Sequence, residues 1–366
     1  MLRSTKHILK YQTGTKSKQL DQLFQDYKVD LQFYIDQIWD KKLPLKKFLS
    51  SKDCPSNLFT YSAWKQILYK QASEIIRSNQ KKQKKSKPEI QNTSISLDDR
   101  MFDIEVQEDG HFDEFIHIRL PYFQDGKHRA VTINLPIKYH KHYLKYADWK
   151  RKKNIKLTKD ESGKYFVFLT FEKEAPVIKS TGKSLGVDIG YKKLLSTSDG
   201  QFLGTDIEQV CTDISKKVRN SKNFKQSLRF RDNEINRVVN ELDLSNVNSL
   251  AIEDLKNVKR NSKKDHRIST KFMNKLQYWV YLSAIGKLVR TCEENGVLLT
   301  KVNPAYTSQT CSVCGSIHKE SRVGERYKCI DCKVEMDADY NAAINILHRA
   351  AKEPCQKSLS TINCGG

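Results

Sequence analysis

The segment KSLGVDIG, residues 183–190, is the strongest indication of how the C-terminal half of this sequence folds. Its apolar residues and its closing glycine predict a short buried β-strand, and one carboxylate, Asp188, stands inside it. A carboxylate that leaves water is costly to bury unless a cation or hydrogen-bond donors compensate its charge. Asp188 is therefore the first candidate for a functional residue.

Two more carboxylates occupy comparable positions further along the chain. Glu253 lies at the end of the apolar part of SLAIEDL, residues 249–255, and Asp339 begins the predicted helix DYNAAINIL, residues 339–347. The elements between these acids alternate between strand and helix, which is typical of an α/β unit. They are a hairpin over 194–206 that turns at Asp199-Gly200, basic helical residues 207–242, a helix over 271–295 and the strand VLLTKVNP over 297–304.

Three carboxylates from the core elements of one α/β unit predict a site for two Mg²⁺ or Mn²⁺ ions. Two such ions hydrolyse phosphodiesters, one activating the attacking water and the other stabilising the leaving 3′ oxygen. Asp188 would bridge the ions, while Glu253 and Asp339 would each hold one. Taken singly, each acid has an alternative role as a turn former or helix cap. Asp337, two residues before Asp339, is the rival candidate for the third acid and ranks second to Asp339; its alternative role is to cap the final helix.

Four of the nine cysteines stand in two pairs. Cys311 and Cys314 are separated by two residues, fourteen residues follow, and Cys329 and Cys332 repeat the spacing. This pattern predicts a tetrahedral four-thiolate Zn²⁺ site, with Gly315 allowing the tight knuckle after the second cysteine. Two disulfides are the alternative, which a reducing compartment disfavours. Since four thiolates leave no open coordination position, the zinc ion is expected to be structural.

The N-terminal half carries a different pattern. Apolar residues at helical spacing predict helices over 16–50 and 61–79, followed by a basic, polar linker over 81–94. From residue 95 to 174, short alternating runs such as YFVFLTFE are separated by turn residues, which predicts an antiparallel sheet or a small barrel. A further strand is expected within residues 1–12.

The charge of the chain indicates a polyanionic partner. Lys and Arg number 65 against 43 Asp and Glu, a formal net charge of +22. The longest apolar run, residues 279–289, is interrupted by polar residues, so no membrane-spanning helix is expected. The charged N-terminus also lacks the unbroken apolar block of a secretory signal. Together these features predict a cytoplasmic protein that binds nucleic acid.

Basic clusters supply the candidate nucleic-acid contacts. One overlaps an aromatic run over residues 139–149, where bases could stack on the rings while cations meet phosphates. The alternative is a helix that caps the sheet, with its rings in the core. Two further clusters lie on the helix over 216–237 and over 256–271, and for both a solvated surface is the alternative. The candidate residues are Lys150, Arg151, Lys152, Arg229, Arg231, Lys259, Arg260, Lys263, Lys264 and Arg267.

On these residues, the C-terminal half resembles the TnpB/OrfB proteins of transposons. The resemblance rests on GVDIG, LAIEDL, NPAYTSQTCSVCG, the second cysteine pair and DADYNAAINIL, all within residues 183–350. The same motifs resemble the miniature type V CRISPR effectors, so they do not separate the two groups. Carried over residue by residue, the RuvC carboxylates of the family fall on Asp188, Glu253 and Asp339, and its zinc ligands fall on the four paired cysteines.

The resemblance implies a multidomain α+β fold. An N-terminal wedge β-barrel over 1–15 and 95–178 would carry an inserted helical recognition segment over 16–94. An RNase H-like (RuvC) α/β nuclease domain would follow, interrupted by a four-cysteine zinc ribbon. The expected bounds of the second part are 179–306 and 334–352 for the nuclease domain, 307–333 for the ribbon and 353–366 for a tail.

The resemblance also implies a magnesium-dependent DNA endonuclease that uses a guide RNA and cuts double-stranded DNA beside a short adjacent motif. Such a protein would act in the cytoplasm of a prokaryote, at the nucleoid when on its target. Alternatives are a miniature CRISPR effector, a non-cleaving RNA-guided repressor, a transposase that joins strands itself, and a zinc-ribbon nucleic-acid binder. The presence of all three acids argues against the non-cleaving repressor.

Overall fold

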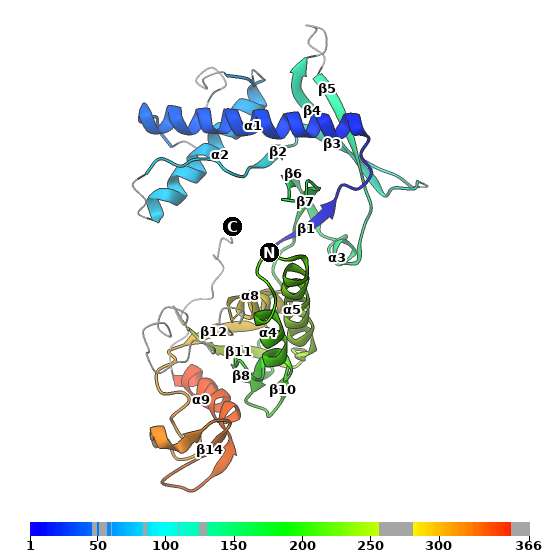
Figure 1. Ribbon diagram of the computed structural model, residues 1–366. Helices are drawn as coiled ribbons and strands as arrows, with labels where there is room; N and C mark the ends of the chain where they lie inside the picture. The colour runs from blue at the N-terminus through cyan, green and yellow to red at the C-terminus, as the bar shows by residue number, and fades with distance from the viewer. Residues whose placement is uncertain are drawn as a thin grey trace. The chain divides into compact units, whose positions relative to one another are not determined.

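The computed structural model describes residues 1–45, 50, 57–59, 61–82, 86–108, 110–123, 130–255 and 281–352. The chain forms two compact units, Met1–Lys173 and Glu174–Gly366, each built around its own main hydrophobic core (Figure 1). No helix within the described ranges is long and apolar enough to cross a membrane.

Two long helices belong to the first unit. Helix α1, Gly14–Asp40, begins where the Thr13 side chain accepts a hydrogen bond from the backbone N–H of Lys16. Helix α2, Ser62–Lys81, packs against α1 and the strands through its apolar face. These helices confirm the predicted helical segments, except that the first ends at Asp40, short of residue 50. Residues 46–49, in the predicted remainder, lie outside the described residues.

Antiparallel strands make up most of the rest of the first unit, as predicted. They form two hydrogen-bonded sheets, of order β1-β7-β6-β2 and β3-β4-β5, which share one core with the helices. Strand β7 shows the two-residue period that places alternate side chains in this core, since every second residue from Tyr165 to Phe171 is buried. The strands are β1 Leu2–Ile8, β2 Ser94–Asp98, β3 Phe102–Val106, β4 Glu114–Phe123, β5 Ala130–Ile137, β6 Lys150–Lys159 and β7 Tyr165–Glu172.

The aromatic and basic segment over residues 139–153 is not a single helix. Helix α3 covers only Lys141–Leu144, and from Lys150 the chain is paired with β7 as a strand. Tyr143 and Tyr146 are 6% and 5% exposed and belong to the core of the first unit. The interpretation that places the rings in the core therefore describes these two tyrosines, which are not exposed for base stacking.

The second unit is built around a five-stranded mixed sheet of order β10-β9-β8-β11-β12. Strands β8, β11 and β12 are mutually parallel, whereas β9 runs antiparallel to β8 and pairs with β10 as the predicted hairpin. The hairpin turn contains Gly200 at φ +89°, a conformation that favours glycine. The strands are β8 Lys183–Asp188, β9 Leu195–Thr197, β10 Phe202–Leu203, β11 Val247–Glu253 and β12 Leu298–Val302.

Helices cover both faces of this sheet. Helices α4, α5 and α8 pack on the face that carries Leu185 and Ile252, and α9 packs on the opposite face beside Ala251. Gly186 also faces α9, because a Cβ built there would overlap the carbonyl oxygen of Ala343. The helices are α4 Ile207–Ser215, α5 Lys222–Glu241, α8 Tyr281–Glu294 and α9 Ala338–Lys352.

The basic helical segment predicted over residues 207–242 is two helices rather than one. Helix α4 ends at Ser215, and Asn220 adopts φ +64°, which a continuous right-handed helix does not allow. Ser221 then caps α5, its hydroxyl accepting a hydrogen bond from the Phe224 N–H at 3.1 Å. A local capping sequence therefore divides the segment.

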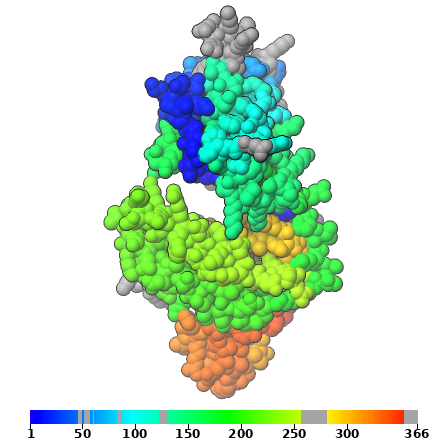
Figure 2. Space-filling view, turned by 90° about the vertical axis from the view of Figure 1, so that its right-hand side faces the viewer, coloured from blue at the N-terminus to red at the C-terminus, as the bar shows by residue number. Residues whose placement is uncertain are grey.

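A small antiparallel sheet of order β13-β14-β15 protrudes from one end of the second unit (Figure 2). It follows the short 3₁₀ helix η1, Lys319–Ser321. The strands are β13 Arg322–Val323, β14 Arg326–Lys328 and β15 Glu335–Asp337. Since β15 is followed immediately by Ala338, the first residue of α9, this sheet is joined directly to the helix that carries Asp339.

Candidate active site and metal centre

The register of the central sheet brings two of the predicted carboxylates together. Asp188 ends β8 and Glu253 ends β11, and the residues before them are paired across these two parallel strands. Because side chains alternate between the faces of a sheet, Asp188 shares the face of Gly186, and Glu253 shares the face of Ala251. That is the face covered by α9. Neighbouring strands lie about 4.8 Å apart, so the two acids are neighbours at one edge of the sheet.

Asp339 joins these acids from the first turn of α9. Burial, and then the negative charges of Glu253 and Asp339, raise the pKa of Asp188 to about 8. Burial also raises the pKa of Glu253 above its ordinary value. Carboxylates that resist ionisation for these reasons are stabilised by a nearby cation. Hard oxygen donors in this arrangement suit a divalent ion such as Mg²⁺.

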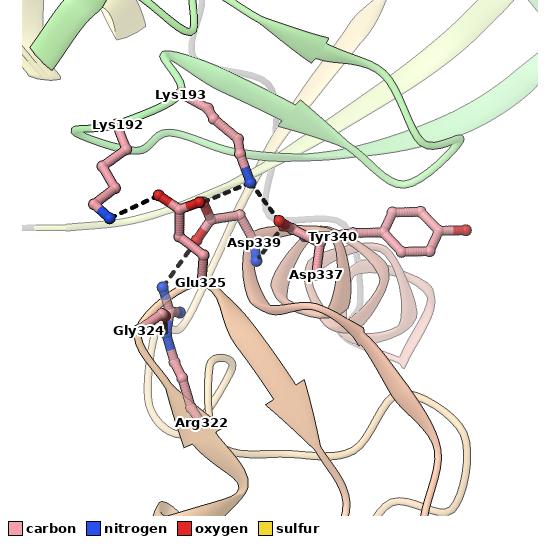
Figure 3. Close-up of polar contacts among 8 residues, drawn as sticks. All are labelled: Lys192, Lys193, Arg322, Gly324, Glu325, Asp337, Asp339 and Tyr340. Carbon is pink, nitrogen blue, oxygen red and sulfur yellow. Dashed lines mark hydrogen bonds and ion pairs between the residues drawn. The ribbon is translucent and has the colours of Figure 1, made fainter.

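Two cations of the chain already contact Asp339 (Figure 3). Arg322 donates from Nη2 to Asp339 Oδ1 at 2.8 Å, and Lys193 Nζ lies 3.7 Å from Asp339 Oδ2. Arg322 comes from the protruding sheet, whereas Lys193 comes from the turn between β8 and β9. The positive charge of Arg322 also lowers the pKa of Asp188 and Glu253, in opposition to their burial. Arg322 therefore acts electrostatically on all three acids.

Asp337 has the capping role predicted as its alternative. Its Oδ1 accepts hydrogen bonds from the backbone N–H groups of Asp339 and Tyr340, at 2.9 and 3.1 Å. These N–H groups belong to the first turn of α9 and have no acceptor within the helix. Asp337 also pairs with Lys193 through its other carboxylate oxygen. The cap therefore fixes the backbone from which the Asp339 side chain extends.

Glu253 is held from the opposite side. The Thr307 hydroxyl donates to the Glu253 carboxylate, and the Tyr281 hydroxyl donates to its backbone carbonyl at 2.7 Å. Thr307 is 2% exposed, and its own carbonyl accepts a hydrogen bond from the Asn345 side chain at 3.0 Å. Tyr281 of α8 and Thr307 thus hold Glu253 directly, and Asn345 of α9 holds Thr307 in turn.

The four predicted zinc ligands converge. Their Sγ atoms all lie within 4.8 Å of one another, with Cys311 and Cys332 3.6 Å apart and Cys314 and Cys329 3.5 Å apart. A disulfide requires about 2.05 Å, so the alternative of two disulfides is wrong. A zinc tetrahedron with Zn–S of about 2.3 Å has edges of roughly 3.8 Å, close to the observed spacing. The cluster could therefore hold a metal ion. Among the described residues, these cysteines are the group of three or more possible ligand side chains found this close together; Asp188, Glu253 and Asp339 do not form such a group, although their charges interact.

The backbone shapes the first knuckle, and one hydroxyl favours the thiolate form of two of the four cysteines. Gly315, directly after Cys314, adopts φ +79°, as the predicted knuckle requires. The Ser316 hydroxyl contacts Cys314 Sγ at 3.0 Å and Cys329 Sγ at 3.3 Å. Its hydrogen bonding lowers the pKa of the Cys314 thiol and brings the pKa of the Cys329 thiol to about 6. Thiolates are the species that bind metal, so Ser316 favours binding.

Two asparagines of α9 connect the cysteine cluster to the carboxylates, and the sequence reasoning did not identify them. Asn341 accepts a hydrogen bond from the Ser312 N–H at 2.9 Å and donates to the Thr310 carbonyl at 2.8 Å. Asn345 donates to the same carbonyl at 2.7 Å. Both are buried, and their i, i+4 spacing on an otherwise apolar helical face was the available signal. They fasten the first cysteine knuckle to α9.

The predicted nucleic-acid contacts differ widely in their surroundings. In the first unit, the Lys150 side chain is 81% exposed, whereas Arg151 donates at 2.8 Å to Glu114, which is fully buried. Lys152 pairs with Glu172 at 2.7 Å. In the second unit, Arg229 is exposed, whereas the Arg231 side chain is only 11% exposed and pairs with Asp232. Lys259, Arg260, Lys263, Lys264 and Arg267 lie outside the described residues.

Residues 284–346 match a known protein family, described as Cas12f1-like, TNB domain. The matched segment contains most of α8, all four clustered cysteines and Asp339. The chain is also similar to curated proteins of two related groups, the CRISPR-associated Cas12f1 proteins and the TnpB-like transposon proteins. The resemblance predicted from the motifs is therefore confirmed.

Two of these relatives illustrate both groups. "CRISPR-associated endodeoxyribonuclease Cas12f1" of Sulfoacidibacillus thermotolerans is 39% identical over 99 residues, covering 27% of this chain and 21% of that protein. "Putative RNA-guided DNA endonuclease InsQ" of Escherichia coli strain K12 is 25% identical over 232 residues, covering 53% of this chain and 56% of that protein. The matches thus span from about a fifth to just over half of these relatives.

A solved structure extends the likeness to both units. The cryo-EM structure of the Cas12f1-sgRNA-target DNA complex matches with a TM-score of 0.58 and 18% sequence identity. The match covers 90% of this chain and 81% of the Cas12f1 chain. At this identity the likeness concerns the fold. The mixed α/β multidomain architecture of Cas12f1 is therefore also that of this chain.

Proposed function

We propose that this chain is an RNA-guided DNA endonuclease of the TnpB type, which cuts DNA with the carboxylates of Asp188, Glu253 and Asp339. The observation that carries the proposal is the placement of these acids on the α9 face of the central sheet, where burial and the charges of Glu253 and Asp339 raise the pKa of Asp188. Two come from the ends of parallel strands, and the third comes from the first turn of the helix packed on that face. Ligand sites of α/β sheets form at the carboxyl ends of their strands.

The proposal assigns the second unit to the RNase H-like (RuvC) class, with the zinc ribbon as an insertion between β12 and α9. Support comes from the mixed sheet, which has helices on both faces, and from the position of the cysteine cluster before α9. The first unit is inferred to be the wedge barrel with its helical recognition insertion. Its two antiparallel sheets and two long helices support that assignment.

In this site Asp188, Glu253 and Asp339 would together hold the divalent ions. Bound Mg²⁺ or Mn²⁺ would activate the attacking water and stabilise the leaving oxygen. Thr307 orients the Glu253 carboxylate by hydrogen bonding, and Asp337 fixes the backbone of Asp339. These contacts prearrange the acids, so less reorganisation is needed when the ions bind.

The cysteine cluster is inferred to hold one structural Zn²⁺. Four thiolates close the coordination shell, so the ion would stabilise the ribbon and take no part in the chemistry. The ribbon carries Arg322, which contacts Asp339. Zinc would therefore stabilise the ribbon that places Arg322 beside Asp339.

The partners proposed for this chain are a guide RNA and double-stranded DNA with a short adjacent motif. The net charge of +22 supports polyanion binding, and exposed cations such as Lys150 and Arg229 would meet phosphates. Arg151 is better assigned to its buried ion pair with Glu114 than to a phosphate contact. We also propose that this chain acts in the cytoplasm of a prokaryote.

A second candidate function is that of a miniature type V CRISPR effector, and the Cas12f1-like TNB domain over residues 284–346 favours it. Both candidates use the same carboxylate site. They differ in the origin of the guide RNA, from a transposon end in one case and from a CRISPR array in the other.

Sequencing of the RNA that copurifies with the full chain, expressed with its native flanking DNA, tests guided function. A discrete RNA with a constant structured part and a variable end would support both candidates, and its origin would decide between them. Recovery of only bulk cellular RNA would overturn guided function. The recovered RNA then supplies the guide for cleavage assays with Mg²⁺.

A further inference from the structure

Lys193 is more buried than the other cations around Asp339. Its side chain is 13% exposed, against 32% for Arg322 and 52% for Lys192. The Lys193 ammonium lies 4.4 Å from the centre of the Phe202 ring, and its partners are the carboxylates of Asp337 and Asp339 (Figure 3). It is thus a fixed positive charge inside the site.

Lys193 connects the element that bears one proposed metal ligand to the element that bears another. It lies in the turn after β8, five residues beyond Asp188, and its partners are the last residue of β15 and the second residue of α9. Through Asp337 it supports the cap that holds the Asp339 backbone, and its ammonium also lies 3.7 Å from the Asp339 carboxylate. The position of Asp339 therefore depends on Lys193 in two ways.

A divalent ion held by Asp339 would be close to this ammonium. The two positive charges would repel each other, and both would compete for the same carboxylate. The cost is large where side chains are partly removed from water, because screening is weak there. An ammonium in this position therefore opposes the binding of a divalent ion while it stabilises the acids that are to bind it.

We propose that Lys193 is a positioning residue that serves as an internal counter-cation of the carboxylate site. It holds Asp339 in place when no divalent ion is bound, and it sets the affinity for divalent ions by competing for the Asp339 carboxylate. The inference rests on the proposed function, since it takes the three acids as metal ligands. The direction of the effect on ion affinity follows from thermodynamic linkage, because a contact that favours the ion-free site weakens ion binding by the same factor.

Calorimetric titration of the zinc-loaded chain with Mn²⁺ tests this inference without a cleavage assay. Lys193→Met removes the charge and retains much of the stem over Phe202, and it should tighten Mn²⁺ binding on the order of tenfold. Lys193→Gln removes the charge but keeps a hydrogen-bond donor, so it should also tighten binding and serves if Lys193→Met fails to fold. Unchanged or weaker Mn²⁺ binding in the folded variants would overturn the inference.

Lys192→Met is the matched control. Lys192 precedes Lys193 in the same turn but pairs with Glu325 at 2.7 Å, so its loss should change Mn²⁺ affinity by less than about twofold. Lys193→Arg keeps the charge and should stay close to the wild-type affinity. Asp188→Asn distinguishes a failure of the Lys193 inference from a failure of the carboxylate site. If that variant bound Mn²⁺ as tightly as wild type, the carboxylate site itself would be wrong, whatever the Lys193 variants showed.

Discussion

Gly186 and Ala343 bring the central strand β8 and the helix α9 into backbone contact. A Cβ at Gly186 would overlap the Ala343 carbonyl oxygen and lie 2.8 Å from the Leu347 backbone nitrogen. This close packing of β8 against α9 places Asp188, two residues further along the same face of the strand, beside the helix that carries Asp339. The shape of the carboxylate site therefore depends on the absence of a side chain at residue 186.

Gly186→Ala should displace α9 from the sheet. We expect a loss of about 1–3 kcal/mol in the free energy of unfolding, as for other overpacked cores, and a loss of cleavage. Gly286→Ala is the control, because a Cβ added at this residue of α8 would meet nothing within 4 Å. It should be neutral or stabilising by roughly 0.5–1 kcal/mol. Equal stability of the two variants in denaturant titrations would contradict the close packing.

The pKa of Asp188 gives a pH dependence with a definite sign. Burial and the neighbouring acids raise this pKa from 3.8 to about 8, so the protonated form is favoured in the fold. The stability that Asp188 contributes is then present below about pH 4 and is lost as the pH rises through about 8. Asp188→Asn mimics the protonated form, so this variant should keep that stability as the pH rises.

Thermal unfolding of the zinc-loaded protein checks this prediction. Without Mg²⁺ or Mn²⁺, the midpoint of Asp188→Asn relative to wild type should increase between pH 5 and pH 8. Added Mg²⁺ should reduce that increase, because a bound cation favours the ionised carboxylate. A difference that stays constant with pH would show that Asp188 is not buried among other acids.

Ser316 should control zinc retention at mildly acidic pH. Its hydroxyl lowers the pKa of the thiols of Cys314 and Cys329, so Ser316→Ala would raise both and protons would compete better with zinc. Loss of such a contact costs about 10- to 100-fold in metal affinity. Ser312→Ala, in the same knuckle, is the control, because its hydroxyl contacts Met336 rather than a cysteine. Zinc competition with a chelator between pH 5 and 7 measures the difference.

Substitutions of Arg151 and Lys150 should differ in their effect on stability, because Arg151 has a structural ion pair whereas Lys150 is a candidate phosphate contact. Arg151→Met leaves the fully buried Glu114 without its charge partner and should destabilise the first unit by about 3–5 kcal/mol. Lys150→Met removes an 81% exposed side chain and should leave stability within about 0.5 kcal/mol. Denaturant titration measures both values. Equal stabilities would return Arg151 to the set of candidate phosphate contacts.

The elements of the second unit were predictable because their signals are local. The buried strand around Asp188, the hairpin at Asp199-Gly200 and the cysteine pairs each occupy a short run of sequence. Capping of α9 was the alternative role predicted for Asp337, and its hydrogen bonds match that role. Hydrophobic period, turn residues and ligand spacing are sufficient for features of this kind.

Contacts between elements were not predictable in the same way. Lys193, Arg322 and Thr307 act on acids from other segments, and lysine, arginine and threonine are common in solvated turns. Arg151 shows the converse, since a basic run predicted a phosphate contact where strand pairing turns the side chain to a buried acid. A side chain's partner depends on which elements pack together, and a single sequence does not report that.

DNA cleavage by the complex of this chain with its copurified guide RNA is the direct test of whether the three acids form one metal-dependent site. Wild type should cut a matching DNA with Mg²⁺, and Asp188→Asn should lose at least about 10³-fold in rate while it retains guide and target binding. Asp199→Asn, a hairpin-turn carboxylate paired with Lys183, should cut normally. Full cleavage by Asp188→Asn would contradict the site.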